Sequence, residues 1–364
     1  MNSKKKKILF LSPYPKDKAP SQRLKYEQYF KCFSDNNYDI EVSSFVSYNF
    51  WSIIYVKGNT LSKFYYTIIG YLKRIIKLFY IKKYDIVYVH LWITPFGLPI
   101  FEWLYAKLSK KLIYDIDDMV FLGHSSDANS FIQRLKGQQK MIYLMKKSNH
   151  VITCTPKLDE FVRKYNSKTT DISSTVDTNS RYLEKKDYSV SNEFVIGWSG
   201  SHSTSKYLYL LEDVLKDLSK KYNIKLLVMG DALFNIEGIN IEAKEWKEEY
   251  EIKTLRRFDI GLYPLPDEDW VLGKSGLKAI QYMALGIPTI ATAIGANYRI
   301  INDGENGFLV DVSNNNLWYK RIEQLINSKE LREKLGEVGR KTIIDKYSIE
   351  ANKQKYLDVF SSVL

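Results

Sequence analysis

The chain has 364 residues, of which 45% are hydrophobic, and a formal net charge of +12. This length exceeds what one core usually supports, so we expect two domains, and the charge favours an anionic partner such as a phosphorylated substrate, an anionic lipid or a nucleic acid. Cys32 and Cys154 are far apart and lack metal-ligand spacing, which excludes a disulfide framework and suits a reducing compartment.

Short apolar runs recur along the first half of the chain, beginning at residues 7–12. The basic start before this run resembles a signal peptide, but the run is too short and no small-residue cleavage site follows, so we expect a buried strand. Further runs alternate with helical patterns, which predicts a parallel sheet covered by helices on both faces. These runs lie at residues 38–45, 84–91, 111–117, 150–154 and 171–176.

Residues 61–83 show an amphipathic helical pattern. At 100° per residue, one face carries the cations Lys63, Lys73, Arg74 and Lys77. The opposite face carries Leu61, Tyr65, Ile68, Leu72, Ile75, Ile76 and Phe79. Two interpretations stay open: the apolar stripe packs on the sheet, or the helix lies in a membrane interface with its cations at anionic headgroups. No run reaches eighteen apolar residues, so we expect no membrane-spanning helix.

A polar stretch at residues 178–193 predicts a linker, after which strand and helix patterns alternate again. The second series of strands is expected at residues 194–200, 224–230, 258–264, 287–292 and 307–311. The expected fold class is therefore α/β, with two Rossmann-like, doubly wound domains that face a central cleft. The boundaries predicted are 1–180 for the N-terminal domain, 181–193 for the linker, 194–345 for the C-terminal domain, and 346–364 for a C-terminal helix with a path back to the N-terminal domain.

The stretch at residues 273–288, GKSGLKAIQYMALGIP, begins like the end of a phosphate-binding P-loop. That motif needs a glycine where this chain has Glu268, and the residues between are acidic and apolar, so a P-loop is excluded. A helix that starts near Ser275 would instead project three side chains to one side: Lys274, Lys278 and Gln281. A helix start with two added ammonium groups suits a diphosphate, and a solvated basic helix edge is the alternative.

Residues 258–310, from FDIGLYP to GFLV, resemble the C-terminal domain of GT-B glycosyltransferases of family 4, the "glycosyl transferases group 1" type. They are especially similar to the branch with Gly-Lys-x-x-x-Lys and Gln-Tyr-Met-Ala. Residues 173–182 resemble the segment that joins the two domains in that family, and residues 301–310 resemble its late Asp-Gly-x-x-Gly turn. Residues 19–30 resemble the N-terminal segment of that branch. The resemblance covers essentially the whole chain and implies a GT-B fold and sugar transfer with retention of configuration.

The resemblance assigns the sugar donor to the C-terminal domain, although this sequence departs from the family pattern. Of the family's two glutamates eight positions apart, the first falls on Gly273 and the second on Gln281, whose amide lacks charge-assisted hydrogen bonding. The family's Arg and Lys after the first strand fall on Ser201 and Lys206, so one cation is missing and Lys274 is expected to replace it. The candidate donor-binding residues are Gly200, Ser201, Lys206, Lys274, Ser275, Lys278 and Gln281.

An acidic cluster lies at the end of the predicted strand at residues 111–117. Asp115, Asp117 and Asp118 would repel one another unless hydrogen bonds or a cation compensate their charges. The resemblance places an acceptor-side group near this position, so Asp117 is a predicted catalytic residue. Asp-x-Asp also binds a divalent metal in GT-A glycosyltransferases, but that fold has no place for a second parallel domain. The resemblance to the GT-B family implies that no metal is required.

Arg23 and the four histidines complete the candidates. Arg23 follows the first strand and is predicted to reach the donor phosphate or the acceptor, and His124 is assigned to the same role. His90 follows the third predicted strand and is a candidate catalytic residue. A lone histidine is more often structural than catalytic, and His150 and His202 are expected to be structural.

The sequence therefore predicts a metal-independent hexosyltransferase that moves a sugar from a UDP- or GDP-type nucleotide sugar to a lipid-linked or cell-surface polysaccharide acceptor. No cofactor is expected. The expected place is the cytoplasm, peripheral at the inner face of the plasma membrane, with an anionic membrane surface as a partner. The alternatives are a GT-B nucleotide-sugar epimerase or phosphorylase, the latter disfavoured because no cofactor-lysine site is recognisable, and a non-enzymatic basic binding protein. Nucleic acid is not an expected partner, since no basic helix with interleaved aromatics accompanies a recognition motif.

Overall fold

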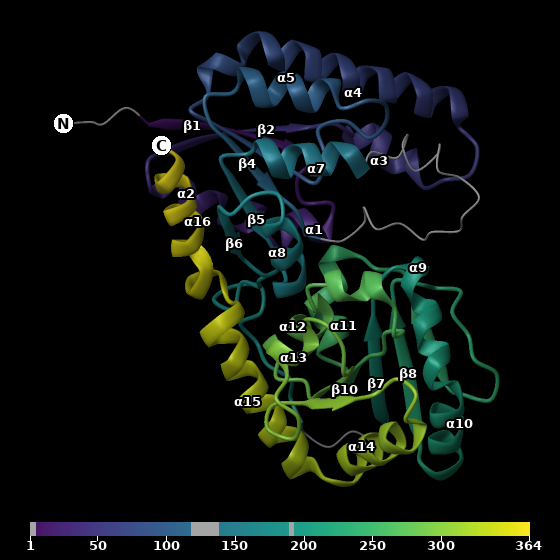
Figure 1. Ribbon diagram of the computed structural model, residues 1–364. Helices are drawn as coiled ribbons and strands as arrows, with labels where there is room; N and C mark the ends of the chain where they lie inside the picture. Colours follow the sequence, from purple (N-terminus) through teal and green to yellow (C-terminus); the bar gives the residue numbers. More distant parts are fainter. Residues whose placement is uncertain (1–4, 118–137, 189–192) are drawn as a thin grey trace. The chain divides into compact units, whose positions relative to one another are not determined.

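The computed structural model describes residues 5–117, 138–188 and 193–364 (Figure 1). The chain forms two compact units, unit 1 with Met1–Ser174 and Asn352–Leu364, and unit 2 with Thr175–Ala351. Each unit contains a six-stranded sheet whose neighbouring strands pair in parallel. The expected α/β class with two Rossmann-like units is confirmed.

The sheet of unit 1 has the strand order β2-β1-β3-β4-β5-β6. Its strands are β1 (Lys6–Ser12), β2 (Tyr38–Ser44), β3 (Ile86–His90), β4 (Leu112–Asp115), β5 (His150–Thr153) and β6 (Thr169–Asp171). The first five overlap the apolar runs that predict them, whereas β6 ends where its predicted run, residues 171–176, begins. The apolar residues of that run, Ile172 and Val176, are buried but lie beyond the sheet, and Val176 pairs with Ser348 in unit 2.

Alternate side chains of β1 pack on the two opposite faces of this sheet, as expected for a strand that is buried on both sides. Leu9 and Leu11 belong to a core cluster with Tyr105 of α5 (Ile100–Leu108) and with α7 (Gln138–Lys147). Phe10 points the other way, and its ring lies 6.3 Å from that of Phe33 in α2 (Phe30–Asp35).

Helices cover both faces of the unit 1 sheet (Figure 1). The long helix α4 (Thr60–Tyr80), α5 and α7 lie on one face, and α2 and the C-terminal α16 (Ile349–Val363) lie on the other. The shorter helices are α1 (Pro20–Arg23), α3 (Tyr48–Ile54) and α8 (Pro156–Arg163). In α16, the rings of Tyr356 and Phe360 lie 5.6 Å and 4.9 Å from that of Phe33, so the last residues of the chain complete the first unit.

The sheet of unit 2 has the strand order β12-β11-β10-β7-β8-β9. Its strands are β7 (Phe194–Ser199), β8 (Ile224–Met229), β9 (Ile241–Lys244), β10 (Ile260–Tyr263), β11 (Thr289–Thr292) and β12 (Phe308–Val310). The edge strand β9 has no counterpart among the predicted runs, because its sequence IEAK is half polar and all four residues are half-buried. The other five coincide with predicted runs.

The helices of unit 2 are α9 (His202–Ser205), α10 (Glu212–Lys221), α11 (Glu251–Leu255), α12 (Leu277–Ala284), α13 (Asn297–Ile300), α14 (Asn315–Asn327) and α15 (Lys329–Tyr347). Helix α12 is the most enclosed of those that concern the predicted site, since its residues from Ala279 to Ala284 are all buried. Burial of a large apolar side chain stabilises a fold by about 1.5–3 kcal/mol, so α12 anchors the residues around its start.

Residues 181–193, expected as a linker, belong to unit 2. Tyr182 is fully buried, and Arg340 of α15 donates a hydrogen bond to its carbonyl oxygen over 2.9 Å. The ammonium group of Lys186 lies 3.0 Å from the Asp259 carboxylate. The polar composition of this stretch therefore reflects ion pairs along the surface of unit 2 in its described part, residues 181–188.

Arg74 of α4 is fully buried, although the sequence pattern places it on a cationic helix face. Its guanidinium donates to the carbonyl oxygens of Ser12, Ser43 and Ile93 over 2.8–2.9 Å. Burial lowers the pKa of Arg74 to about 10. These bonds fix α4 against the ends of β1 and β2, so the apolar stripe of α4 faces away from the sheet. The packing interpretation of that stripe is therefore wrong.

We expect Arg74→Met to destabilise unit 1 by about 3 kcal/mol or more, because it leaves three buried carbonyl oxygens without their donor. The measurement is urea-dependent hydrogen exchange, which reads peptides of β1 and β2 separately from those of unit 2. Lys77→Met is the matched control, since Lys77 pairs with Glu41 at a partly exposed position and such pairs contribute about 1 kcal/mol or less. Equal effects of the two changes would contradict this role of Arg74.

Among the residues that the structure describes, none of the helices combines the length and hydropathy needed to cross a membrane.

Candidate functional site

The carboxyl ends of β7, β8 and β10 form the edge of unit 2 where parallel sheets bind ligands. Gly200 follows β7, and Gly230 follows β8 with a positive φ of 111°. A Cβ atom on Gly230 would lie 1.7 Å from the carbonyl oxygen of Gly200. Only glycine allows this close approach, which brings the two loops together at one edge.

Lys278, in the first turn of α12, lies at this edge between two aromatic rings. Its ammonium nitrogen is 5.3 Å from the ring centre of Trp198 in β7 and 5.1 Å from that of Tyr263 in β10. Gly200 leaves room for it, because a Cβ there would lie 2.8 Å from Cε of Lys278. Burial, and then repulsion from Lys274, lowers the pKa of Lys278 to about 7. This cation is poorly compensated by its surroundings, so a bound anion would stabilise it.

Lys274 and Ser275 precede α12, which begins at Leu277 and so two residues after the predicted start. The delay follows from Gly276, whose φ of 74° lies in the left-handed region and caps the helix. The ammonium group of Lys274 lies 5.1 Å from the ring centre of Trp270. Lys274 therefore reaches the edge from a loop, while Lys278 reaches it from the helix.

Gln281 is buried one turn further along α12. Its amide nitrogen donates to the Tyr182 hydroxyl over 2.7 Å and to the Glu251 carboxylate over 3.3 Å. The same carboxylate pairs with Arg181 at 2.5 Å. The amide of Gln281 is thus held in a buried hydrogen-bond network of unit 2, and its contact with a donor sugar stays a prediction.

Ser201 and Lys206 lie at the two ends of α9. Ser201 is the N-cap residue of this helix, with a capping box to Thr204, and Lys206 is exposed just after it. The Nδ1 atom of His202 lies 2.9 Å from Asp231, which follows β8. Although burial opposes it, hydrogen bonds from Ser205 and His202 lower the pKa of Asp231. The sequence analysis did not single out Asp231, whose position after a strand end is the signal that could have identified it.

A buried ionic cluster occupies the carboxyl ends of β3 and β4 in unit 1. The ammonium group of Lys25 contacts the Asp115 carboxylate, and both side chains are fully buried. Asp115 also accepts a hydrogen bond from the Tyr88 hydroxyl at 2.5 Å and lies 3.3 Å from Nδ1 of His90. Burial raises the pKa of Asp115, but Lys25 and His90 outweigh it, so the net shift is downward.

His90 itself is fully buried. Its ring lies 5.1 Å from that of Tyr26, and Nε2 is buried without a hydrogen-bond partner among the described residues. His90 lies against the Asp115 carboxylate on one side, as Lys25 does on the other. Lys25 was not among the candidates from the sequence, and the catalytic role of His90 stays a prediction. His150 bonds Thr170 over 2.9 Å.

Asp117 follows this cluster by two residues and is half-buried. Its carbonyl oxygen accepts a hydrogen bond from the Cys154 thiol over 2.8 Å, so its backbone is tied to the end of β5. Arg23, at the end of α1, is buried.

Asp118 and His124 lie outside the residues that the structure describes. Within the described residues, no three His, Cys, Asp or Glu side chains gather as a metal-binding group.

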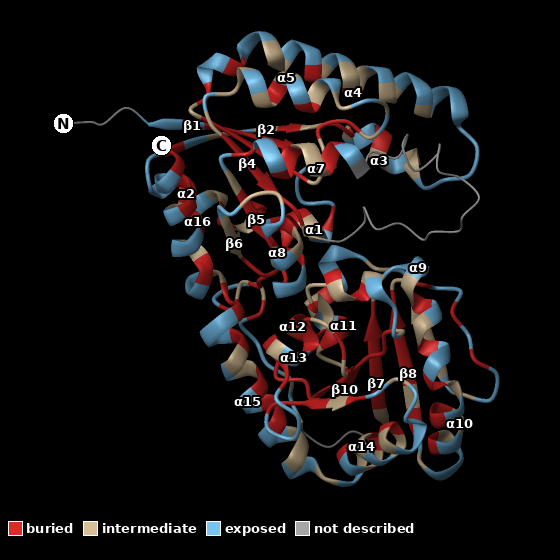
Figure 2. Ribbon diagram, viewed as in Figure 1, coloured by how far each residue is buried: buried red, intermediate tan, exposed pale blue. Residues whose placement is uncertain are grey.

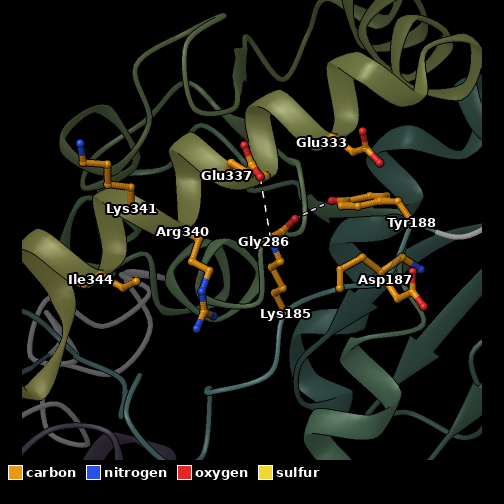
Figure 3. Close-up of a pocket in the computed structure, with 11 residues that line it drawn as sticks. Lys185, Asp187, Tyr188, Gly286, Glu333, Glu337, Arg340, Lys341 and Ile344 are labelled. Carbon is orange, nitrogen blue, oxygen red and sulfur yellow. Dashed lines mark hydrogen bonds and ion pairs between the residues drawn. The ribbon is translucent and has the colours of Figure 1, made fainter.

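A pocket of about 600 Å³ lies elsewhere on unit 2, between α15 and residues 185–188 (Figure 3). In Figure 3 the Tyr188 hydroxyl donates to the carbonyl oxygen of Gly286, and Lys185 pairs with Glu337 at 3.8 Å. Gly286 precedes β11, so this pocket lies at the amino ends of the strands. Four cations and three carboxylates line it, so its cations are largely offset, and it lies away from the predicted donor-binding residues.

The chain is similar in sequence to known glycosyltransferases. Residues 193–328 match the family described as glycosyl transferases group 1. The chain is similar to the capsular polysaccharide biosynthesis glycosyltransferase CapM of Staphylococcus aureus, at 27% identity over 51% of this chain and 50% of that one. It is also similar to the uncharacterized glycosyltransferase MJ1178 of Methanocaldococcus jannaschii, at 30% identity over 60% and 61% of the two chains. These matches span about half to three fifths of the relatives' length.

A solved structure extends the likeness to both units. The Anabaena protein HepE, solved in complex with UDP-glucose, aligns over 98% of this chain and 99% of its own with a TM-score of 0.68 and 16% identity. At this identity the match establishes the fold. The chain therefore has the GT-B fold, and its second unit matches the glycosyl transferases group 1 family.

Proposed function

We propose that this protein is a glycosyltransferase that moves a sugar, with retention of configuration, from a nucleoside diphosphate sugar to a lipid-linked or cell-surface polysaccharide acceptor. The observation that carries the proposal is Lys278, held between Trp198 and Tyr263 at the carboxyl edge of unit 2 with Lys274 beside it. An anion bound there would remove the cost of placing two ammonium groups together. The UDP-glucose complex of HepE and the name of CapM support a nucleotide-sugar donor and a polysaccharide acceptor.

In this proposal the two lysines act on the leaving group. Negative charge develops on the diphosphate as the glycosidic bond breaks, and fixed cations lower the barrier because they stabilise that charge without reorganising. Gly200 and Gly230 bring the loops after β7 and β8 together beside Lys278, because a Cβ on Gly230 would meet Gly200 and a Cβ on Gly200 would meet Lys278. A UDP- or GDP-type donor fits this chemistry without a cofactor or a metal, and thermal-shift measurements with both series of nucleotides and nucleotide sugars would identify it, because a ligand that binds the folded state raises its stability.

The acceptor side of the proposal is Asp117 in unit 1. A carboxylate near an oxocarbenium-like centre stabilises the transition state while it is ionised and well placed. The Lys25–Asp115 pair fixes the end of β4 from which Asp117 extends. We place the enzyme in the cytoplasm at the inner face of the plasma membrane, where lipid-linked acceptors are available.

We expect Asp117→Asn to lower turnover by about a hundredfold while nucleotide affinity changes little, because the donor binds unit 2 in this proposal. The measurements are initial rates with a nucleotide sugar and nucleotide affinity with and without a chelator. Asp39→Asn, an exposed carboxylate of the same unit, is the matched control and should keep full activity. Metal-dependent affinity that collapses in Asp117→Asn would overturn the proposal, since the carboxylate would then be a metal ligand.

A further inference from the structure

Much of helix α4 is exposed (Figure 2), and large apolar side chains form a stripe among its exposed residues. The stripe consists of Leu61, Phe64, Tyr65, Ile68, Leu72, Ile75, Ile76, Phe79 and Tyr80. Leu61 and Phe79, at the two ends, are 86% and 81% exposed. These residues recur every three or four positions and so lie on one face of the helix. The buried residues of α4 are Gly70 and Arg74, on the opposite face.

Neighbouring segments of unit 1 extend this apolar area. Exposed apolar residues from the start of α5 and the loop before it are Phe96, Leu98, Ile100 and Trp103. The Tyr71 hydroxyl of α4 donates to the carbonyl oxygen of Phe96 over 2.8 Å, and its ring lies 5.6 Å from that of Phe101, so the two segments adjoin. We call these residues and the stripe together the α4–α5 surface. Contiguous apolar areas of this kind mark an interface with a membrane or a protein.

The charge around the α4–α5 surface has a single sign. Residues 42–84 contain seven cationic side chains and no Asp or Glu. The seven are Lys57, Lys63, Lys73, Arg74, Lys77, Lys82 and Lys83. Lys57, Lys82 and Lys83 are exposed, whereas Arg74 is buried and Lys77 pairs with Glu41. The exposed cations therefore lie at the two ends of α4, while Lys63 and Lys73 within the helix are half-buried.

Aromatic rings accompany these cations. The ammonium group of Lys83 lies 4.4 Å from the ring centre of Tyr80, and that of Lys107 lies 5.1 Å from the ring centre of Trp103. Tyr and Trp prefer the boundary between headgroups and acyl chains, and lysine binds anionic headgroups while its stem covers apolar surface. The Tyr, Trp and Lys residues of the α4–α5 surface are therefore those expected at the boundary between headgroups and acyl chains.

We propose that the α4–α5 surface docks unit 1 on an anionic lipid membrane, with α4 in the plane of the interface. The Ile, Leu and Phe side chains would enter the acyl boundary, and Lys57, Lys82 and Lys83 would contact lipid phosphates. A second copy of the chain is the poorer occupant, because a two-fold interface places the same patch on both partners and would set lysines against lysines. The inference deepens the proposed location at the plasma membrane by naming the surface that binds it, and it does not depend on sugar transfer.

The experiment is co-sedimentation of the full chain with vesicles of phosphatidylcholine alone and of phosphatidylcholine with phosphatidylglycerol. We expect binding to the anionic vesicles that weakens as salt increases. Lys57→Glu/Lys82→Glu/Lys83→Glu should weaken it by at least about a hundredfold at low salt. Ile68→Ser/Leu72→Ser/Phe79→Ser should weaken it by about a hundredfold or more at every salt concentration.

Matched controls separate this surface from net charge and general hydrophobicity. Lys247→Glu/Lys320→Glu/Lys334→Glu changes three exposed lysines of unit 2, and each substitution lowers the net charge by two, so both charge variants fall from +12 to the same value. Leu210→Ser/Leu233→Ser/Val338→Ser changes three exposed apolar residues of unit 2. Both controls should bind anionic vesicles nearly as the wild type does.

Three outcomes would overturn the proposal. One is absence of binding to anionic vesicles by folded wild-type protein. Another is equal loss in the α4–α5 variants and the unit 2 controls, which would indicate unspecific adhesion. The third is a wild-type dimer, seen by analytical ultracentrifugation, that Ile68→Ser/Leu72→Ser/Phe79→Ser converts to monomer while vesicles bind neither form. Because none of these readouts measures sugar transfer, failure of the transferase proposal would leave the result interpretable.

Discussion

Replacing Lys278 with methionine is expected to lower turnover by about a hundredfold or more while it stabilises the protein in the absence of ligand. The turnover falls because the leaving diphosphate loses a fixed cation. The stability rises because the wild type holds an ammonium group in a partly buried place between Trp198 and Tyr263, next to Lys274, and an apolar side chain of similar length avoids that desolvation. A substitution that raises stability while it lowers activity indicates that the replaced residue serves function at the expense of stability.

The same residue predicts a dependence of stability on pH. The pKa of Lys278 is about 7 in the folded chain, below its value of 10.5 when exposed. Between these values the unfolded chain binds more protons, so wild-type stability should increase as pH rises from about 7 to about 10.5. Lys278→Met should remove this contribution. Diphosphate affinity should decrease with rising pH above about 7, because the phosphate favours the protonated lysine.

Thermal melts from pH 6 to pH 10, with and without a nucleoside diphosphate, test both expectations. Lys334→Met, an exposed lysine of α15, is the control and should change neither stability nor turnover appreciably. If Lys278→Met destabilised the unliganded protein and kept its activity, the lysine would be a packing residue, and the donor assignment would fail with it.

Lys25→Met is expected to destabilise unit 1 by about 3–5 kcal/mol, because it leaves the fully buried Asp115 carboxylate without its cation. Lys25→Met/Asp115→Leu should recover a large part of that loss, since removing both charges removes the uncompensated one. Hydrogen exchange of the β3 and β4 peptides during urea titration measures the effect in unit 1, and peptides of β7 report unit 2. The exposed pair Lys110–Asp85 supplies the comparison, and Lys110→Met should cost about 1 kcal/mol or less.

Additive losses in the double variant would contradict the ion-pair account. The cycle also tests the contact between His90 and Asp115. With the Asp115 carboxylate absent, His90→Phe should cost less than it does in the wild type, because the ring then supports no charged partner.

The sequence predicts the sheets well and the surfaces poorly, for physical reasons. A buried parallel strand appears in the sequence as an uninterrupted apolar run. Ten of the twelve strands overlap predicted runs of five to eight residues, whereas β6 meets its run at one residue and β9 has no run. Strand β9 is half-buried at an edge and has no such run. The polar pattern of the expected linker did not reveal that Lys185 pairs with Glu337 of α15 and Lys186 with Asp259, because ion pairs between distant segments leave no local pattern.

The orientation of α4, that is, which of its faces packs on the sheet, could not be predicted from the sequence either. Helical periodicity separates a polar from an apolar face but does not say which one packs inward. Here a buried Arg74 satisfies the carbonyl oxygens of Ser12 and Ser43 at strand ends and that of Ile93 after β3, which fits with the apolar face pointing outward. Lys25 was missed for a related reason, since its partner Asp115 lies ninety residues away. Lys278 was a candidate because the helix start that carries it has a local sequence signature, and its role in donor binding stays a prediction.

The return of α16 to the first unit has a consequence for the order in which the chain folds during synthesis. Asn352–Leu364 belong to unit 1, where Tyr356 and Phe360 cover Phe33. A ribosome delivers these residues only after Thr175–Ala351. All residues of unit 2 are therefore synthesised before unit 1 is complete. Until then the aromatic side chains of α2 have no partner from α16. A nascent chain of this protein exposes these side chains until α16 has been synthesised, and a chaperone that binds aromatic surface would find them there.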